Sequence, residues 1–418
     1  MSPSGSVNTL PCCILMSDPL SATAAGDRPA IITRTTTVPF SAAGHGEPPR
    51  ALVATPEVAT LLSIYQALDA HRVIAPLHPR LAPAELNRQR TIVGDATFAD
   101  DDAFVLFTSG STGTPRGIIH TRESIIAAAR ASERRLTWHD DDRWLLCLPL
   151  AHSGGLSIVV RCLAARLPLV LHEGDFDATA VRALIAEAHV TLASLVPTQL
   201  AALLDDPHWR PPAHLRAVLL GGAAAPHALV EQALARGVPV HQTYGLTETF
   251  GQVATAEVPG GPLVPLAGVE LHGSPLRIRG PMLARAYLDG AAIAPELVTA
   301  DLAEVDATLN ILGRADDVII TGGENVHPAE VEAALAATPG IRAACVFGVP
   351  DTRWGQLVGA AIVTGPAFDR AAATAHWRAT LPAHARPRRL AVVDALPLLP
   401  NGKVDRRAAS NLPTQPAE

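Results

Sequence analysis

The chain is poor in aromatic residues and in charge. Of its 418 residues, only 4% are aromatic and 17% are charged, while 48% are hydrophobic. This composition excludes a disordered protein, and alanine, valine and leucine must fill the interior. The 33 basic and 40 acidic residues give a formal net charge of -7 without a basic cluster. The sequence therefore argues against nucleic acid as a partner.

Several functional patterns are also missing. The five cysteines lack metal-ligand spacing, and an odd number over this length is a poor disulfide framework, which favours a reducing cytoplasm. No run reaches the roughly 18 apolar residues that a membrane span needs, so we expect no membrane insertion. Neither GxGxxG nor GxxxxGK(S/T) occurs, which argues against hydride transfer and against phosphoryl transfer at a Walker site.

The hydrophobic pattern predicts an α/β fold. Residues 1–50 have weak periodicity, and we expect them to be loosely ordered or an atypical edge of the first domain. From Ala51 onward, short apolar strands alternate with helical stretches for more than two hundred residues. Such alternation predicts βαβ units with largely parallel sheets. Expected elements include strands at 104–107, 167–171 and 217–220 and helices at 57–71, 123–135 and 178–189.

A short polar segment at 313–317 separates two apolar runs. Beyond it, about a hundred residues have a periodicity of their own, which predicts a small α+β domain. We therefore expect an N-terminal domain at 1–313 and a C-terminal domain at 314–418, with a hinge at 314–317.

A loop rich in glycine and hydroxyls lies between an apolar strand and a helical pattern. Residues 107–117 read FTSGSTGTPRG. Glycines let backbone N–H groups approach a polyanion closely, and the hydroxyls and one guanidinium add donors. By composition alone, a solvated turn stays open as the alternative. The candidate phosphate ligands are Thr108, Ser109, Gly110, Ser111, Thr112, Gly113 and Arg116.

This string is similar to TSGSTGxPKG, the signature loop of the adenylate-forming superfamily of acyl-CoA synthetases, peptide-synthetase adenylation domains and luciferases. Arg116 stands where the family usually has lysine, which keeps the positive charge. The resemblance extends from about Leu52 to Arg406. It implies a large domain with a small mobile lid, and ATP, Mg²⁺ and coenzyme A as the cofactor and co-substrates.

Further motifs of the family follow in order. The segment 242–249 resembles YGxTE, which implies that Tyr244 stacks on adenine, Thr247 contacts the α-phosphate and Glu248 helps to hold Mg²⁺. The pair Asp301-Leu302 resembles the end of TGDL, although Ala300 replaces its glycine. Together with the Gly-Gly-Ala turn after the strand at 217–220, the resemblance implies nucleotide contacts from Gly221, Gly222, Ala223, Gln242, Tyr244, Gly245, Thr247, Asp301 and Arg314.

The segment 399–406 resembles the family's C-terminal Gly-Lys signature, which implies that Lys403 acts in adenylation. The resemblance further implies that the small domain rotates about Asp316 between two half-reactions. In the second half-reaction, Gly322, Gly323 and Glu324 would line the path of CoA. The implied catalytic residues are Lys403, His152, Thr247 and Glu248.

Two strings, 148–158 and 247–255, resemble in particular the o-succinylbenzoate-CoA ligases of menaquinone biosynthesis. That resemblance implies an aromatic carboxylic acid as the substrate, with His152, Ser153, Ser157 and Gln252 near it. Three alternatives stay open: another aryl or short-chain acyl-CoA ligase, an enzyme that loads a carrier protein, and an inactive nucleotide-binding homologue. The oligomeric state, a homodimer included, also stays open.

Overall fold

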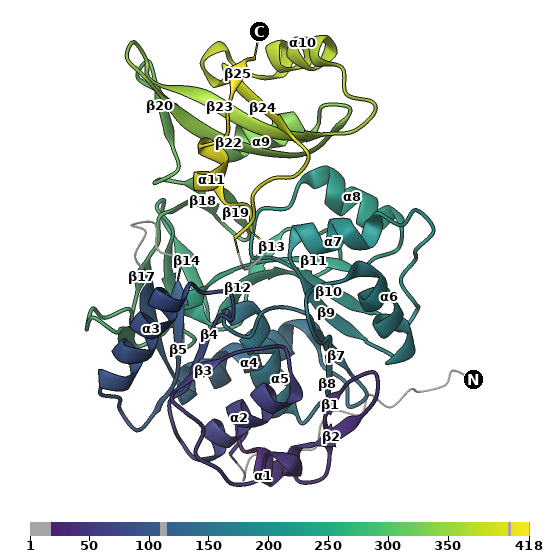
Figure 1. Cartoon of the computed structure of the whole chain (residues 1–418), viewed down its shortest axis with the longest axis vertical. Coiled ribbons are helices and arrows are strands. Elements are labelled where there is room, and N and C mark those ends of the chain that lie inside the picture. Colours follow the sequence, from purple (N-terminus) through teal and green to yellow (C-terminus); the bar gives the residue numbers. More distant parts are fainter. Residues whose placement is uncertain (1–17, 109–114, 400–402, 418) are drawn as a thin grey trace.

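The computed structural model describes residues 18–108, 115–399 and 403–417. A large N-terminal domain carries a smaller C-terminal domain at one end (Figure 1). Strand β19 (Leu309–Arg314) belongs to the main sheet of the large domain, and β20 (Ile319–Thr321) belongs to the sheet of the small domain. The predicted hinge at 314–317 begins at the last residue of β19 and continues into the segment between these two strands, and rotation about it stays a prediction.

Within the described residues, an 11-stranded sheet in the order β18-β19-β13-β12-β11-β10-β9-β7-β8-β1-β2 forms the centre of the large domain. Strands β11, β10, β9, β7, β8 and β1 pair in parallel, whereas β18, β19, β13 and β12 continue the sheet in antiparallel fashion. The α/β class is confirmed. The expected parallel pairing is confirmed for the half of the sheet from β11 to β1, and the half from β12 to β18 is antiparallel.

The strands of this sheet are short and, in its parallel half, mostly buried. Their bounds are β1 (Pro29–Ile32), β2 (Thr37–Pro39), β7 (Trp144–Leu146), β8 (Leu169–Leu171), β9 (Leu192–Leu195), β10 (Ala217–Leu220), β11 (Val240–Leu246), β12 (Gly251–Ala256), β13 (Leu263–Pro265) and β18 (Asp301–Val305). Strands β1 and β2, both within the first fifty residues, lie at one edge of the sheet.

Helices cover both faces of the parallel strands. One hydrophobic core includes side chains of α2 (Val58–Asp69), α4 (Arg122–Leu136) and α5 (Ser153–Ala165). A second core includes side chains of α6 (Ala178–Glu187), α7 (Pro197–Leu204) and α8 (His227–Ala235). None of the described helices is long and apolar enough to cross a membrane.

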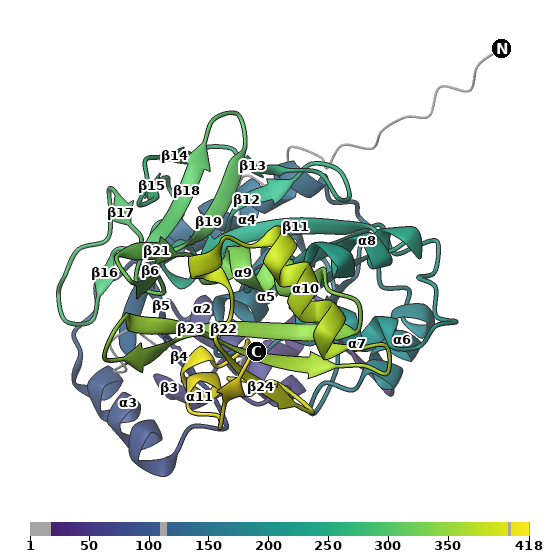
Figure 2. The ribbon, with the colours of Figure 1, turned by 90° about the horizontal axis from the view of Figure 1, so that it is seen from above.

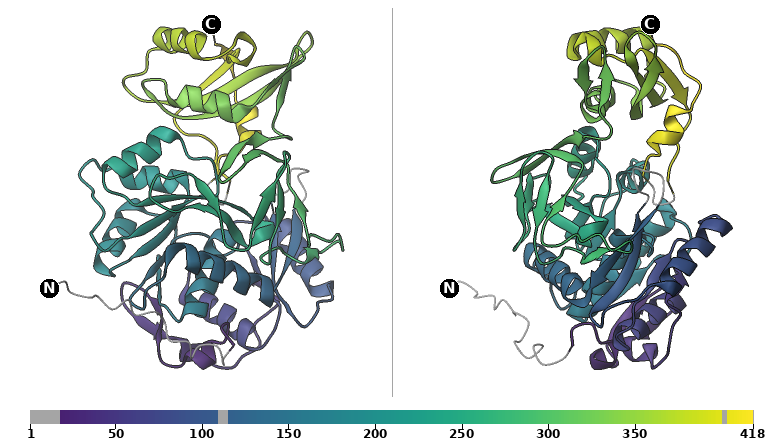
Figure 3. Two further views of the ribbon diagram at one scale, coloured as in Figure 1. Left: turned by 180° about the vertical axis from the view of Figure 1, so that it is seen from behind. Right: turned by 90° about the vertical axis from the view of Figure 1, so that its left-hand side faces the viewer.

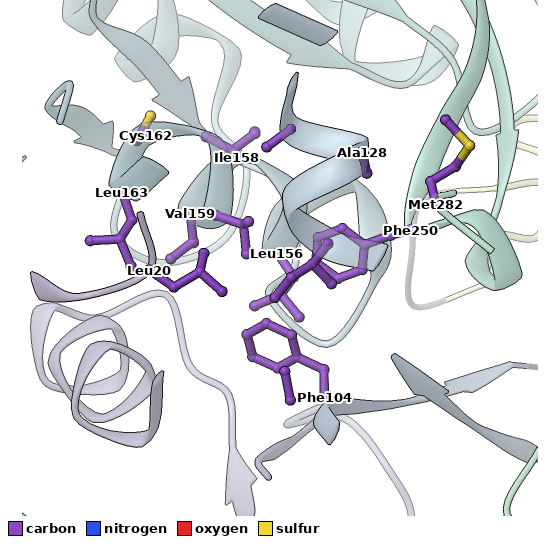
Figure 4. Packing of buried hydrophobic residues seen from close by; sticks show 14 of the residues in the cluster. Leu20, Phe104, Ala128, Leu156, Ile158, Val159, Cys162, Leu163, Phe250 and Met282 are labelled. Carbon is purple, nitrogen blue, oxygen red and sulfur yellow. The ribbon is translucent and has the colours of Figure 1, made fainter. Parts of the chain in front are cut away.

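Helix α5 lies in the middle of the first core. Its residues 155–163 are all buried, because the helix is apolar around most of its circumference. Figure 4 shows Leu156 of α5 beside the rings of Phe104 and Phe250, whose centroids are 5.9 Å apart. This packing fixes α5 against the strand that follows the predicted Mg²⁺ motif.

The predicted phosphate loop connects two antiparallel strands, β5 (Asp102–Thr108) and β6 (Arg116–Thr121). Strand β6 was not predicted, and the helix predicted at 123–135 follows it as α4. The side chain of Thr121 caps that helix by accepting a hydrogen bond from the backbone N–H of Ser124, at 3.1 Å. Residues 109–114 lie outside the described residues. Beyond β6, strand β16 (Ala286–Tyr287) completes this small sheet.

The small domain is built on two long strands, β22 (Ile341–Asp351) and β23 (Gly355–Thr364). Its core packs these strands against α9 (Pro328–Ala336) and α10 (Arg370–Thr380). Figure 3 shows from two sides that this domain stands on one end of the large domain. The other elements described in this domain are β21 (Glu324–Val326), η4 (Ala383–Ala385), β24 (Arg389–Val393), α11 (Arg406–Ser410) and β25 (Gln415–Pro416).

Candidate active site

The predicted nucleotide residues come from the carboxyl end of the parallel strands and from the paired strands β18 and β19, which begin with Asp301 and end with Arg314. Residues 221–223 directly follow β10, and Tyr244 lies near the end of the neighbouring β11. Ligands of open α/β sheets bind at such strand ends. Figure 2 shows that the small domain lies over this part of the large domain.

Tyr244, Asp301 and Arg314 form a connected polar network. The hydroxyl of Tyr244 donates to one oxygen of Asp301, and Arg314 donates to the other at 3.1 Å. Arg314 also donates two hydrogen bonds, of 2.8 and 2.7 Å, to Asp316. Burial, followed by the charge of Asp301, raises the pKa of Tyr244, so its hydroxyl stays protonated. The carboxylate predicted to hold the ribose is therefore oriented by two donors.

Lys403 reaches this network from the small domain. Its Cε lies 3.7 Å from the position that a Cβ on Gly222 would take, and Gly222 has φ +81°, which favours glycine. Lys403 is exposed, but partial desolvation where it meets the large domain, and then the charge of Arg314, lower its pKa, while Asp301 opposes this shift. The lysine and the predicted adenine-cradling turn are thus in contact although they are far apart in the sequence.

His152 lies close to the same lysine. Burial lowers its pKa to about 4, with smaller contributions from His78 and Lys403. The rings of His78 and His152 have centroids 5.5 Å apart, and Nε2 of His152 is buried without a hydrogen-bond partner. His152 is therefore neutral at physiological pH, with a ring nitrogen available to a ligand.

The turn that carries Thr247 and Glu248 is tightly packed. A Cβ on Gly245 would lie 1.7 Å from the carbonyl oxygen of Gly251, so only glycine fits there. Glu248 is half-buried, and one of its oxygens accepts a hydrogen bond of 3.1 Å from the hydroxyl of Tyr287. A single carboxylate with a free oxygen beside a phosphate site suits Mg²⁺, which takes one or two carboxylates plus phosphate and water oxygens.

Of the predicted phosphate loop, the structure describes Thr108 and Arg116. The hydroxyl of Thr108 lies 3.5 Å from the backbone oxygen of Arg116, which joins the two ends of the loop. Arg116 donates to Asp289 at 2.8 Å. The predictions for Ser109, Gly110, Ser111, Thr112 and Gly113 lie outside the described residues.

The predicted acyl residues lie along α5. His152 is the residue before the helix, Ser153 begins it, and the hydroxyl of the buried Ser157 donates to the carbonyl of Gly154 at 3.1 Å. One turn beyond Ser157, on the same face of the helix, is Arg161.

Arg161 is a buried cation whose guanidinium lies 5.1 Å from the centre of the Trp144 ring and has no counterion among the described residues. It is only 3% exposed, and no described carboxylate forms an ion pair with it. Its Nε is buried without a hydrogen-bond partner, and burial lowers its pKa to about 10. Its Nη2 and the hydroxyl of Ser157 both face Gly251, at 3.9 and 3.8 Å from the position of a Cβ there. A buried charge is costly unless it is paired, so this guanidinium is suited to an anionic ligand.

Gln252 is held within the core. Its oxygen accepts a hydrogen bond of 2.8 Å from Ser132, and its Nε2 donates one of 2.8 Å to Thr255. These contacts join α4 to β12. Its predicted role beside the acid stays a prediction.

The predicted CoA-path residues lie in the turn between β20 and β21. A Cβ on Gly322 would lie 2.6 Å from the ring of Trp354, so this turn packs closely on that indole. Gly323 has φ +87° and open space around its Cα, and Glu324 begins β21. The role of this turn in binding CoA stays a prediction.

Sequence reasoning missed Arg161 and Tyr287. A signal for Arg161 was available: it is the one charge within the apolar run 156–163, where a helix buried on all sides demands a partner for it. Tyr287 gave no comparable signal, because its importance depends on contacts with Arg116 and Glu248, which are far away in the sequence.

Comparisons with known proteins agree with this geometry. Residues 81–286 match the AMP-binding enzyme family, and residues 330–403 match the AMP-binding enzyme C-terminal domain. The 2-succinylbenzoate–CoA ligase of Bacillus licheniformis is 34% identical over 334 residues, covering 73% of this chain and 69% of that protein. The probable 2-succinylbenzoate–CoA ligase of Mycobacterium tuberculosis is 40% identical over 331 residues, covering 74% of this chain and 84% of that protein.

Solved structures of the o-succinylbenzoate CoA synthetase of Bacillus subtilis share the fold. Its complex with the acyl-adenylate OSB-AMP is 26% identical, with a TM-score of 0.81, and the match covers 95% of this chain and 98% of that chain. A double mutant of it bound to the product analogue OSB-NCoA is also 26% identical, with a TM-score of 0.64 over 96% and 99% of the two chains. The chain belongs to the AMP-binding enzyme family, among its adenylate-forming acid–CoA ligases.

Proposed function

We propose that the acid is 2-succinylbenzoate, which the enzyme converts to an acyl-adenylate with release of pyrophosphate and then to the CoA thioester with release of AMP. The observation that supports this choice is the buried guanidinium of Arg161, which forms no ion pair with a described carboxylate. After one carboxylate of the acid has been activated, the other still needs a cation. A buried guanidinium on the same face of α5 as Ser157 can supply it.

The other side chains fit the first half-reaction. Lys403 and Arg116 would offset negative charge as the carboxylate attacks the α-phosphate, and Asp301 would hold the ribose hydroxyls. Mg²⁺, held by Glu248 and the phosphates, would supply further charge compensation. His152, neutral at physiological pH, can donate or accept a hydrogen bond at the carboxylate without adding charge.

The second half-reaction needs a route for the thiol. The thiol attacks the acyl carbon, its S–C bond forms as the C–O bond to AMP breaks, and the thiol proton leaves to solvent. Because Lys403 occupies the site in the arrangement described here, we propose that the small domain turns about Asp316 first, which would bring the turn at 322–324 to the site.

Location and assembly follow from less specific features. The described cysteines, Cys147, Cys162 and Cys345, are free thiols, which supports a cytoplasmic location. A homodimer stays a prediction that gel filtration with light scattering can test.

The test is pyrophosphate release by the purified protein with ATP, Mg²⁺ and a panel of acids. The panel contains 2-succinylbenzoate, two analogues that each lack one of its carboxylates, benzoate, short-chain acids and amino acids. We expect 2-succinylbenzoate to give the highest kcat/KM by at least about tenfold, and mass spectrometry to detect the thioester when CoA is added. Equal rates for the monocarboxylic acids would contradict the assignment of the acid. Activity with a carrier protein and not with CoA would contradict the assignment of the thiol.

A further inference from the structure

The strand end at 286–289 lies alongside the exit of the predicted phosphate loop. In the register of β16 and β6, Tyr287 is opposite Ile118, and the backbone N–H of Leu288 donates to the carbonyl of Gly117 at 2.8 Å. Tyr287 is therefore held by backbone pairing next to Arg116, and its side chain is half-buried.

The ring of Tyr287 contacts the cation at the end of that loop. The guanidinium carbon of Arg116 lies 3.5 Å from the ring centroid. A planar guanidinium stacks on an aromatic face far better than a lysine ammonium does. This stacking is a physical reason for arginine at position 116, where the family usually has lysine. The stacking limits the directions in which Arg116 can present its donors.

The hydroxyl of the same side chain contacts the predicted Mg²⁺ ligand. It donates a hydrogen bond of 3.1 Å to one oxygen of Glu248. It occupies one carboxylate oxygen and leaves the other free to bind a metal.

We propose that Tyr287 is a positioning residue that couples Arg116 to Glu248. Its ring orients Arg116 towards the phosphates of ATP, and its hydroxyl orients Glu248 towards Mg²⁺. One side chain then sets the spacing between the phosphate-binding cation and the metal-binding carboxylate. This inference rests on the proposed roles of Arg116 and Glu248 in binding ATP–Mg²⁺, and it does not depend on which acid is activated.

Three variants separate the two contacts. Tyr287→Phe keeps the ring and removes the hydroxyl, Tyr287→Leu removes both, and Arg116→Lys keeps the charge and removes the planar stack. Calorimetry on the full chain gives the Kd for ATP at saturating Mg²⁺ and the Mg²⁺ concentration that half-saturates ATP binding. Circular dichroism of each variant checks the fold.

For Tyr287→Phe, we expect the half-saturating Mg²⁺ concentration to rise about five- to tenfold, with a Kd for ATP within about twofold of the wild-type value. Tyr287→Leu adds a rise of about three- to tenfold in the Kd for ATP, and Arg116→Lys raises that Kd about threefold with no change in the Mg²⁺ requirement. A merely structural role would change both quantities together in Tyr287→Phe.

Two results would overturn the proposal: an unchanged Mg²⁺ requirement in Tyr287→Phe, or an unchanged Kd for ATP in Arg116→Lys. Both variants are conservative, so the test stands even where Tyr287→Leu does not fold. Wild-type protein that binds ATP–Mg²⁺ but releases no pyrophosphate with 2-succinylbenzoate would contradict only the assignment of the acid. Wild-type protein that does not bind ATP would remove the basis of both proposals.

Discussion

The nucleotide half and the acyl half of the site differ in how their charges are paired. On the nucleotide side, Asp301 already binds Tyr244 and Arg314, and Glu248 binds Tyr287. On the acyl side, Arg161 has no described carboxylate partner, and Nε2 of His152 is buried without a hydrogen-bond partner.

This difference separates what the protein supplies from what the substrate must supply. A network that is satisfied before ATP arrives is rigid and requires little reorganisation during the reaction. An unpaired buried cation costs stability until an anion arrives, so its cost is offset only by the correct acid. We infer that the nucleotide half sets the chemistry that the family shares and that the acyl half sets the choice of acid.

The largest effect is expected where the two halves meet. Lys403→Ala removes the cation that contacts Gly222, and we expect the rate of acyl-adenylate formation to fall by roughly 10³. The second half-reaction, started from synthetic acyl-adenylate and CoA, should change by less than about threefold. Single-turnover assays of each half-reaction measure this split, and an equal loss in both would contradict it.

A smaller effect is expected on the acyl side. Arg161→Leu removes the unpaired cation, and we expect kcat/KM for 2-succinylbenzoate to fall about 10- to 100-fold while the monocarboxylic analogues lose little. The melting temperature should stay the same or rise, because an uncompensated buried charge has been removed.

Arg122 provides the matched control, since it is buried but paired: it donates to Asp18 and to the carbonyl of Leu68. Arg122→Leu should lower the melting temperature and leave the selectivity among acids unchanged. If Arg161→Leu destabilised the fold as Arg122→Leu does, Arg161 would have a structural partner rather than a substrate.

A pH effect is expected in the core beneath the nucleotide half. His120 is fully buried with its ring 5.1 Å from that of Phe250, and burial lowers its pKa to about 3. As the pH falls below the ordinary value of about 6.5, the unfolded chain binds a proton that the folded chain does not, so stability is lost down to about pH 3.

The measurement is urea unfolding of wild type and His120→Leu at about pH 7 and about pH 4.5. The wild type should lose roughly 3 kcal/mol more than the variant between these values, since the leucine takes up no proton. Equal losses in both proteins would show that His120 takes up a proton in the folded chain as readily as in the unfolded chain, which would contradict its lowered pKa.

The smallest effect concerns the exposed ion pair of Arg116. Asp289→Asn removes a negative charge that competes with phosphate, while its Oδ1 can still accept from the N–H of Ala291. We expect the Kd for ATP to fall about two- to threefold, since an exposed pair contributes less than about 1 kcal/mol. If Asp289→Asn bound ATP more weakly than the wild type in a titration, Asp289 would orient Arg116 towards ATP and not compete with ATP for it.

Local sequence patterns predicted the elements that fold by burial of short apolar runs. Strand β10 lies at the predicted residues, and α4 differs by one residue at each end. Strand β6 was missed because β-branched residues beside a loop suit a helix start as well as a strand, and pairing with β5 and β16 decides between them. The antiparallel half of the main sheet was missed because pairing direction is a long-range property.

For the candidate site, motif resemblance identified residues that the fold does bring together. Tyr244, Asp301 and Arg314 are joined by hydrogen bonds, and Lys403 contacts Gly222. The same reasoning missed Arg161, although it is the one charge within the apolar run 156–163. It could not find Tyr287, whose role depends on simultaneous contacts with Arg116 and Glu248 that are not visible along the chain.

The most direct measurement is a crystal structure of the protein with a stable analogue of 2-succinylbenzoyl-adenylate. The account predicts that the free carboxylate lies about 3 Å from the guanidinium of Arg161, with the adenosine beside Gly222 and Asp301. A free carboxylate that points to solvent, with Arg161 still without an anionic partner, would contradict it.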